Sequence, residues 1–159
     1  MMDQQNICRI IFLDIDGVLN SQEKLIEVYN KTHKPHSGYN YPFDEKCLSI
    51  LKEIVLLTDS YIVITSSWRK DEEGRDTILN KLREYDLDNR LLGYTPILGT
   101  NRGKEIKAYL NSINMPVEYI IIDDDSDMDE LIDYLIKTNI RNGLTNKEKD
   151  EAIKKFLRK

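Results

Sequence analysis

The sequence predicts an α/β fold, a three-layer α/β/α sandwich in which helices cover both faces of a central parallel sheet. Short apolar segments rich in β-branched residues, such as IIFL at 10–13 and YIVIT at 61–65, alternate with segments of helical character. Because these strand-like segments lack a polar side, both faces of the sheet must be covered, which is typical of parallel sheets. The length of 159 residues suits one domain, so we expect a single domain over residues 1–159.

Each element follows from a local pattern along the chain. Short apolar runs predict strands at residues 7–13, 61–65, 91–93, 117–123 and 135–138. Amphipathic or polar segments predict helices at residues 21–30, 45–58, 75–85, 103–113, 128–134 and 146–159. Asp44 can cap the helix at 45–58, and residues 31–42, rich in Pro, Gly, His and Tyr, are expected to form a loop. The apolar face of the helix at 45–58 is expected to contain Leu48, Leu51, Val55 and Leu56.

The composition is that of an ordinary globular protein, with 40% hydrophobic and 32% charged residues. No apolar run approaches the roughly 18 residues that a membrane helix needs, and MMDQQNICRI lacks the features of a signal peptide. We therefore expect a cytoplasmic protein without a membrane partner, in which Cys8 and Cys47 are reduced thiols. The net charge of −5 argues against nucleic-acid binding over the whole surface, although six Lys and Arg residues within 147–159 leave a local contact open.

Polar residues stand at the ends of three predicted strands. Asp14 and Asp16 follow the first strand. Thr65 and Ser66 lie at the end of the second, and the aspartates 123–125 lie at the end of the fourth. Because the carboxyl ends of parallel strands share one edge of the sheet, we expect these side chains to converge. Carboxylates held so close together need a cation, and Mg²⁺ prefers oxygen ligands, so the sequence predicts a Mg²⁺ site.

These residue types support phosphoryl transfer. With a metal bound, Asp14 can attack phosphorus as a nucleophile, while Asp16 can protonate the leaving oxygen and later deprotonate the hydrolytic water. A hydroxyl at the second strand end can hydrogen-bond the phosphoryl group, and Arg102 or Lys104 at a helix start can balance its charge. Taken singly, these features also fit turns, helix caps and surface charges. Their order at successive strand ends favours a site, and their spacing excludes an EF-hand calcium loop and a P-loop.

At these positions the sequence resembles the haloacid dehalogenase (HAD) superfamily of phosphatases and phosphotransferases. FLDIDGVLN resembles the first HAD motif, hhhhDxDG, and YIVITSS, NRGKE and YIIIDDD resemble the second, third and fourth motifs in the expected order. More narrowly, ITSSWR, TNRGKEIKAYL, IIDDDSD and NGLT are similar to small HAD domains associated with RNA-repair proteins. The resemblance implies a HAD-like, Rossmann-type fold and a phosphatase that forms an aspartyl-phosphate.

The resemblance also implies the residues of the site. Asp14 becomes the nucleophile and a metal ligand, while Asp16 becomes the general acid and base and ligates Mg²⁺ through its backbone carbonyl. The other implied residues are Thr65 with help from Ser66 for the phosphate, Asp123 and then Asp124 for the metal, and Arg102, ranked slightly before Lys104, for the third-motif cation.

Residues 21–43 are too short for the cap domain that HAD enzymes often carry, so we expect a flap-like insertion with minimal or no cap. The resulting open site suits a phosphate on a large partner or at a nucleotide end. Tyr39 and Tyr41 in this flap can stack on a base, although tyrosines are also common on loop surfaces.

The leading hypothesis is a Mg²⁺-dependent phosphomonoester hydrolase acting on nucleotides or nucleic-acid ends. The alternative is a non-catalytic HAD-like module that binds phosphate or nucleotide. Phosphoproteins also remain open as substrates, as does the oligomeric state.

Overall fold

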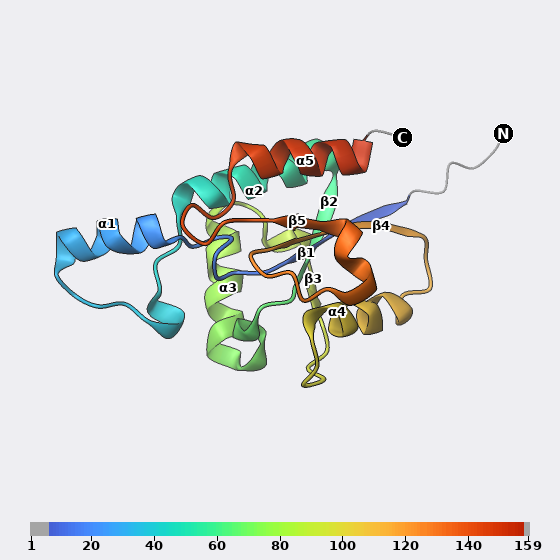
Figure 1. The fold of residues 1–159 in the computed structure, drawn as a ribbon, viewed down its shortest axis with the longest axis horizontal. Coiled ribbons are helices and arrows are strands. Elements are labelled where there is room, and N and C mark those ends of the chain that lie inside the picture. Colours follow the sequence, from blue (N-terminus) through green and yellow to red (C-terminus); the bar gives the residue numbers. More distant parts are fainter. Residues whose placement is uncertain (1–6, 158–159) are drawn as a thin grey trace.

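The computed structural model describes residues 7–157, and at its centre lies a sheet of five parallel strands in the order β3-β2-β1-β4-β5 (Figure 1). The strands are β1 (Cys8–Leu13), β2 (Ser60–Ile64), β3 (Leu91–Tyr94), β4 (Val117–Asp123) and β5 (Leu135–Lys137). Residues alternate between the two faces of the central strand, so that Ile11 and Leu13 join one buried cluster while Ile10 and Phe12 join the other. Burial on both faces explains why β1 is apolar from Ile10 to Leu13, and it confirms the predicted parallel α/β sheet.

Helices cover both faces of the sheet (Figure 1). The α-helices are α1 (Gln22–Thr32), α2 (Glu45–Thr58), α3 (Glu72–Glu84), α4 (Arg102–Asn111) and α5 (Asn146–Leu157). Helices α2, α3 and α5 contribute buried side chains to one cluster, and α4 contributes Ile106 to the other. Short 3₁₀ helices lie at η1 (Gly38–Asn40), η2 (Ser67–Lys70), η3 (Asp88–Arg90) and η4 (Asp129–Tyr134).

Three local predictions differ from the structure. Leu56 is 60% exposed, and Ile54 takes the expected place in the core, because the buried stripe of α2 continues from Leu51 through Ile54 and Val55. The helix predicted at residues 128–134 is present as a 3₁₀ helix that begins one residue later, at Asp129. Helix α3 begins three residues earlier than predicted because Asp71 caps it, accepting a hydrogen bond from the Gly74 N–H at 2.9 Å. The predicted end of the last helix at 158–159 lies outside the described residues.

The segment 21–43 leaves the body of the molecule and returns to the same point. Asn20 and Phe43 form an isolated antiparallel bridge at its base, where the Ser21 hydroxyl also donates to Asp44 at 2.9 Å. Between these points, α1 projects away from the sheet and has no buried residue (Figure 1). Within the described residues the segment therefore adds one α-helix and the short η1, and no separate cap domain.

None of the helices within residues 7–157 is both long enough and apolar enough to cross a membrane.

Candidate active site

The carboxyl ends of β1, β2 and β4 bring three of the predicted polar groups together. The backbone ladder continues one residue past the strands, because the Asp14 N–H donates to Ile122 O at 3.0 Å and the Thr65 N–H donates to Leu13 O at 2.9 Å. Leu13 pairs with Ile122, so Asp14 lies opposite Asp123 on the neighbouring strand. One carboxylate oxygen each from Asp14, Asp123 and Asp124 lies within 4.8 Å of the others.

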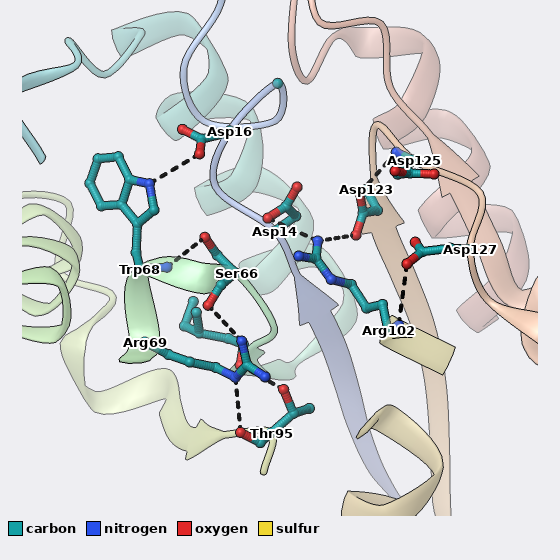
Figure 2. A network of polar contacts seen from close by, with 12 residues as sticks. Asp14, Asp16, Ser66, Trp68, Arg69, Thr95, Arg102, Asp123, Asp125 and Asp127 are labelled. Carbon is teal, nitrogen blue, oxygen red and sulfur yellow. Dashed lines mark hydrogen bonds and ion pairs between the residues drawn. The ribbon is translucent and has the colours of Figure 1, made fainter. Parts of the chain in front are cut away.

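Arg102, the first residue of α4, reaches into this acidic cluster (Figure 2). Its Nη1 lies 3.0 Å from Asp14 Oδ1 and 2.5 Å from Asp123 Oδ2. Burial alone would lower the pKa of Arg102, but Asp14 and Asp123 raise it above its ordinary value, so the guanidinium stays charged. One guanidinium against three carboxylates leaves two negative charges when all three are ionised.

The acidic cluster has the chemistry of a hard divalent cation site. Burial, followed by the charge of Asp123, raises the pKa of Asp14 well above its usual value, and Arg102 opposes this. Burial and Asp123 likewise raise the pKa of Asp124. Both shifts show that negative charge in this pocket is costly without compensation. Oxygen-only donors and an excess of two negative charges fit a hard divalent metal ion.

Asp16 lies just beyond the cluster and is held by two donors. The indole Nε1 of Trp68 donates to Asp16 Oδ2 at 3.1 Å, and Asn20 Nδ2 donates to Asp16 Oδ1 at 2.8 Å. Figure 2 shows the Asp16 carboxylate directed toward Trp68. The turn that follows Asp16 needs glycine at position 17, because the φ of Gly17 is +77°. A Cβ atom at this position would also lie only 2.5 Å from Asp124 Oδ2.

The two hydroxyls after β2 differ in their bonding. Among the described residues, Thr65 Oγ1 is the one buried side-chain oxygen or nitrogen without a hydrogen-bond partner. The Ser66 hydroxyl caps η2 and accepts from the Trp68 N–H at 3.2 Å. A buried hydroxyl without a partner costs free energy unless a ligand satisfies it, so Thr65 is the better candidate for ligand contact.

The remaining acidic residues bind the start of α4. Asp127 accepts from the Arg102 N–H at 3.3 Å, and Asp129 accepts from Asn101 Nδ2 at 2.8 Å. The backbone of this acidic segment lies directly on Gly103, where an added Cβ would meet Met128 O at 2.2 Å. Asp123 and Asp124 therefore face the site, whereas Asp127 and Asp129 hold the start of α4 in place.

The two candidates for the third-motif cation end up in different places. Arg102 contacts two carboxylates of the cluster, whereas the side chain of Lys104 is exposed and forms no ion pair with any described residue.

The flap tyrosines lie beside the site and are partly buried. Tyr39 donates its hydroxyl to Asp71, and its ring meets Trp68 edge-on at 5.2 Å between centroids. Burial, and then the charge of Asp16, raises the pKa of Tyr41. Their role in stacking on a base stays a prediction.

Sequence reasoning missed a buried ion pair next to the site. Arg69 Nη2 lies 3.0 Å from Glu105 Oε2, and the two side chains are 2% and 9% exposed. Arg69 lies in ITSSWR and Glu105 in TNRGKEIKAYL. The three-residue spacing of Arg102 and Glu105, which places them on one face of a helix, is the sequence signal that points to Glu105.

A comparison with protein-family models identifies the family of the chain. Residues 10–149 match the model described as "HAD domain in Swiss Army Knife RNA repair proteins". No curated protein matches the chain.

Proposed function

Because the chain belongs to the HAD domain family of Swiss Army Knife RNA repair proteins, we propose that it is a Mg²⁺-dependent phosphomonoester hydrolase acting on phosphorylated nucleic-acid ends. The observation that carries the proposal is the buried, unpartnered hydroxyl of Thr65, one strand away from Asp14. A phosphoryl group has several anionic oxygens that need donors. Thr65 and the guanidinium of Arg102 are two donors that its oxygens can use.

In the proposed reaction Asp14 is the nucleophile. One of its carboxylate oxygens bonds to phosphorus while the bond between phosphorus and the leaving oxygen breaks. Asp16 gives its proton to the leaving oxygen, which departs as an alcohol. A water oxygen then bonds to phosphorus while the bond between phosphorus and the Asp14 oxygen breaks, and Asp16 takes the proton from that water. The products are inorganic phosphate and a regenerated Asp14.

The other residues stabilise charge during both steps. Thr65 donates to a phosphoryl oxygen, and Ser66 supports it by shaping the turn into η2. Arg102 offsets the negative charge that develops on the phosphoryl group. Asp14, Asp123 and Asp124, with the backbone carbonyl of Asp16, would hold Mg²⁺. When bound, that ion supplies Lewis-acid neutralisation of the phosphate oxygens.

The family description and the open site together favour nucleic-acid ends as substrates. The short segment 21–43 forms a projecting helix and no lid over the strand ends, so a terminal phosphate on a long polymer can approach. Free nucleotides and phosphoproteins are the competing substrate classes.

A substrate screen tests the proposal directly. Wild-type protein is incubated with Mg²⁺ and an aryl phosphate, RNA and DNA oligonucleotides phosphorylated at either end, free nucleotides and sugar phosphates. We expect Mg²⁺-dependent release of phosphate, fastest from an oligonucleotide end, and no turnover by a folded Asp14→Asn variant.

Two outcomes would contradict the proposal in different ways. Equal turnover by Asp14→Asn would exclude the aspartyl-phosphate mechanism. Tight binding of phosphate or nucleotide without turnover across the whole panel would favour a non-catalytic binding module.

A further inference from the structure

Arg69 is a buried cation that touches neither the acidic cluster nor solvent. Its guanidinium donates to three backbone carbonyls, those of Ser66 at 3.0 Å, Thr95 at 3.0 Å and Pro96 at 3.1 Å. Figure 2 shows the Arg69 side chain between η2 and the segment that follows β3. Every nitrogen of the guanidinium therefore has an acceptor, and the residue joins the end of β2 to the end of β3.

The fourth partner of Arg69 is Glu105 on α4, at 3.0 Å. The same oxygen, Glu105 Oε2, also accepts from the Leu98 N–H at 2.8 Å. Glu105 lies three residues after Arg102, so both side chains leave one face of α4. When Arg69 holds Glu105, it therefore also fixes the rotation of α4 about its axis, and with it the direction in which Arg102 points.

The pair connects the two parts of the proposed phosphate site that come from different elements. On one side, Arg69 holds the carbonyl of Ser66, the residue directly after the Thr65 hydroxyl. On the other side, Glu105 anchors the helix whose first residue is Arg102. Glu105 also neutralises Arg69, so that Arg102 is the guanidinium whose charge is directed at the site.

We infer that Arg69 and Glu105 form a positioning pair, which sets the distance between the Thr65 hydroxyl and the Arg102 guanidinium to that required by a phosphoryl group. This inference rests on the proposed function. Neither residue contacts the reacting atoms, and each acts through its neighbour. Stability alone does not require a buried ion pair at this place, since an apolar pair of similar volume often stabilises a fold equally well.

The test uses conservative variants, because Arg69→Ala would leave Glu105 buried without its partner. In Glu105→Gln the carbonyl oxygen can still accept from Arg69 and Leu98, but the negative charge is lost. Arg69→Lys keeps the charge and loses the planar fork. Lys107→Gln is the matched control, since Lys107 lies on the same helix as Glu105 and forms an exposed ion pair with Glu130 of η4. Folding is followed by circular dichroism, and binding of Mg²⁺ and of inorganic phosphate by calorimetry.

We expect Glu105→Gln to lower kcat on an aryl phosphate by about 10- to 100-fold, because a small misplacement of catalytic groups has effects of this size. Phosphate affinity should fall about tenfold, while Mg²⁺ affinity stays within about twofold. Arg69→Lys should show the same pattern more weakly, and Lys107→Gln should match the wild type.

A double-mutant cycle separates positioning from structure. If Glu105 acts through the phosphate site, Glu105→Gln should have a much smaller effect in a Thr65→Ala background, because that background already lacks one of the two positioned groups. Equal effects in both backgrounds would overturn the inference, as would wild-type kcat and phosphate affinity in a folded Glu105→Gln. Unfolding of both Glu105→Gln and Arg69→Lys would overturn it in favour of a structural pair.

The binding measurements keep this inference distinct from the proposed function. A wild type that binds phosphate without turning over any substrate would refute the phosphatase proposal, and the phosphate affinities of the variants would still decide the role of the pair. A wild type that binds no phosphate at all would overturn both.

Discussion

Trp68 donates its indole N–H to the carboxylate of Asp16 at 3.1 Å, joining the turn after β2 to the turn after β1. Asn20 donates to the other oxygen of the same carboxylate. Two donors from different segments thus fix the residue that we propose as general acid and base. Trp68 therefore has a hydrogen bond to the proposed general acid and base in addition to its place in the buried core.

Replacing Trp68 by Phe should lower kcat without a comparable change in KM. Phe keeps an aromatic ring between Tyr39 and Phe43, whose rings meet Trp68 edge-on, and removes the indole N–H that donates to Asp16. A hydrogen bond to a charged group contributes about 1.5 kcal/mol at the lower end, which corresponds to a decrease of about tenfold. Steady-state kinetics measures this effect. Phe43→Leu is the control, because it disturbs the same cluster without removing a donor, and an equal loss of kcat there would refute the specific role of the indole.

The fluorescence of Trp68 should report on phosphate binding. The chain has a single tryptophan, so its emission comes from this site alone. In the proposed reaction the phosphate binds next to Asp16, and its charge together with that of Mg²⁺ should therefore change the electrostatic surroundings of the indole that donates to this carboxylate. We expect a saturable change in emission during a phosphate titration, absent in Asp16→Ala. The same change in Asp16→Ala would show that the signal has another origin.

The strand ends could be predicted from the sequence because apolar runs stop at carboxylates and hydroxyls, and a parallel sheet necessarily gathers such ends. The contacts between Trp68 and Asp16 and between Arg69 and Glu105 could not be predicted in the same way. Each joins residues at least 36 positions apart, and the packing of α4 and η2 decides them.

The choice between Arg102 and Lys104 shows the same limit. Both residues fit the spacing of the third motif, and only the rotation of α4 separates them. The contact of Gly103 with Met128 and the ion pair of Glu105 with Arg69 both contribute to that rotation.

Removing the Arg102 side chain should therefore be far more damaging than removing that of Lys104. Arg102→Ala should lower kcat by roughly 100-fold or more, the usual cost of losing one group that stabilises transition-state charge. Arg102→Lys should lose less activity than Arg102→Ala, since lysine keeps the positive charge but lacks the planar guanidinium with its several N–H donors. Lys104→Ala should stay within about twofold of the wild type, because its side chain is exposed. A comparable loss in Lys104→Ala would instead assign the cation to that residue.

Gly103→Ala should destabilise the protein, although alanine has a higher helix propensity than glycine. Within a helix, Ala normally stabilises by about 1 kcal/mol relative to Gly. Here the new Cβ would lie 2.2 Å from Met128 O, so the acidic segment has to move away from α4, at a cost of about 1–3 kcal/mol. Urea unfolding measures the change, with Lys104→Ala in the same turn as control. A more stable Gly103→Ala would contradict the close contact.

The stability of the metal-free protein should carry a pH dependence that originates at Asp14. Burial and Asp123 raise the pKa of Asp14 well above its ordinary 3.8. Between that ordinary value and the raised folded-state value, the folded protein binds more protons than the unfolded chain. The contribution of Asp14 to the free energy of unfolding therefore falls as pH rises through this window. Glu27, Glu45 and Asp71 have lowered pKa values and contribute the opposite slope.

Subtracting an Asp14→Asn variant isolates this contribution. With a chelator present, the melting temperature of the wild type should fall relative to that of Asp14→Asn as pH rises above about 4. The variant lacks this dependence because Asn carries no titratable proton. Mg²⁺ competes with protons for the carboxylates, so it should stabilise the wild type increasingly at higher pH and should have little effect on the variant. Thermal unfolding measured with and without Mg²⁺ across this pH range gives both quantities. A difference that is flat with pH and unaffected by Mg²⁺ would exclude Asp14 from a metal site, because a buried carboxylate that binds a cation must respond to both.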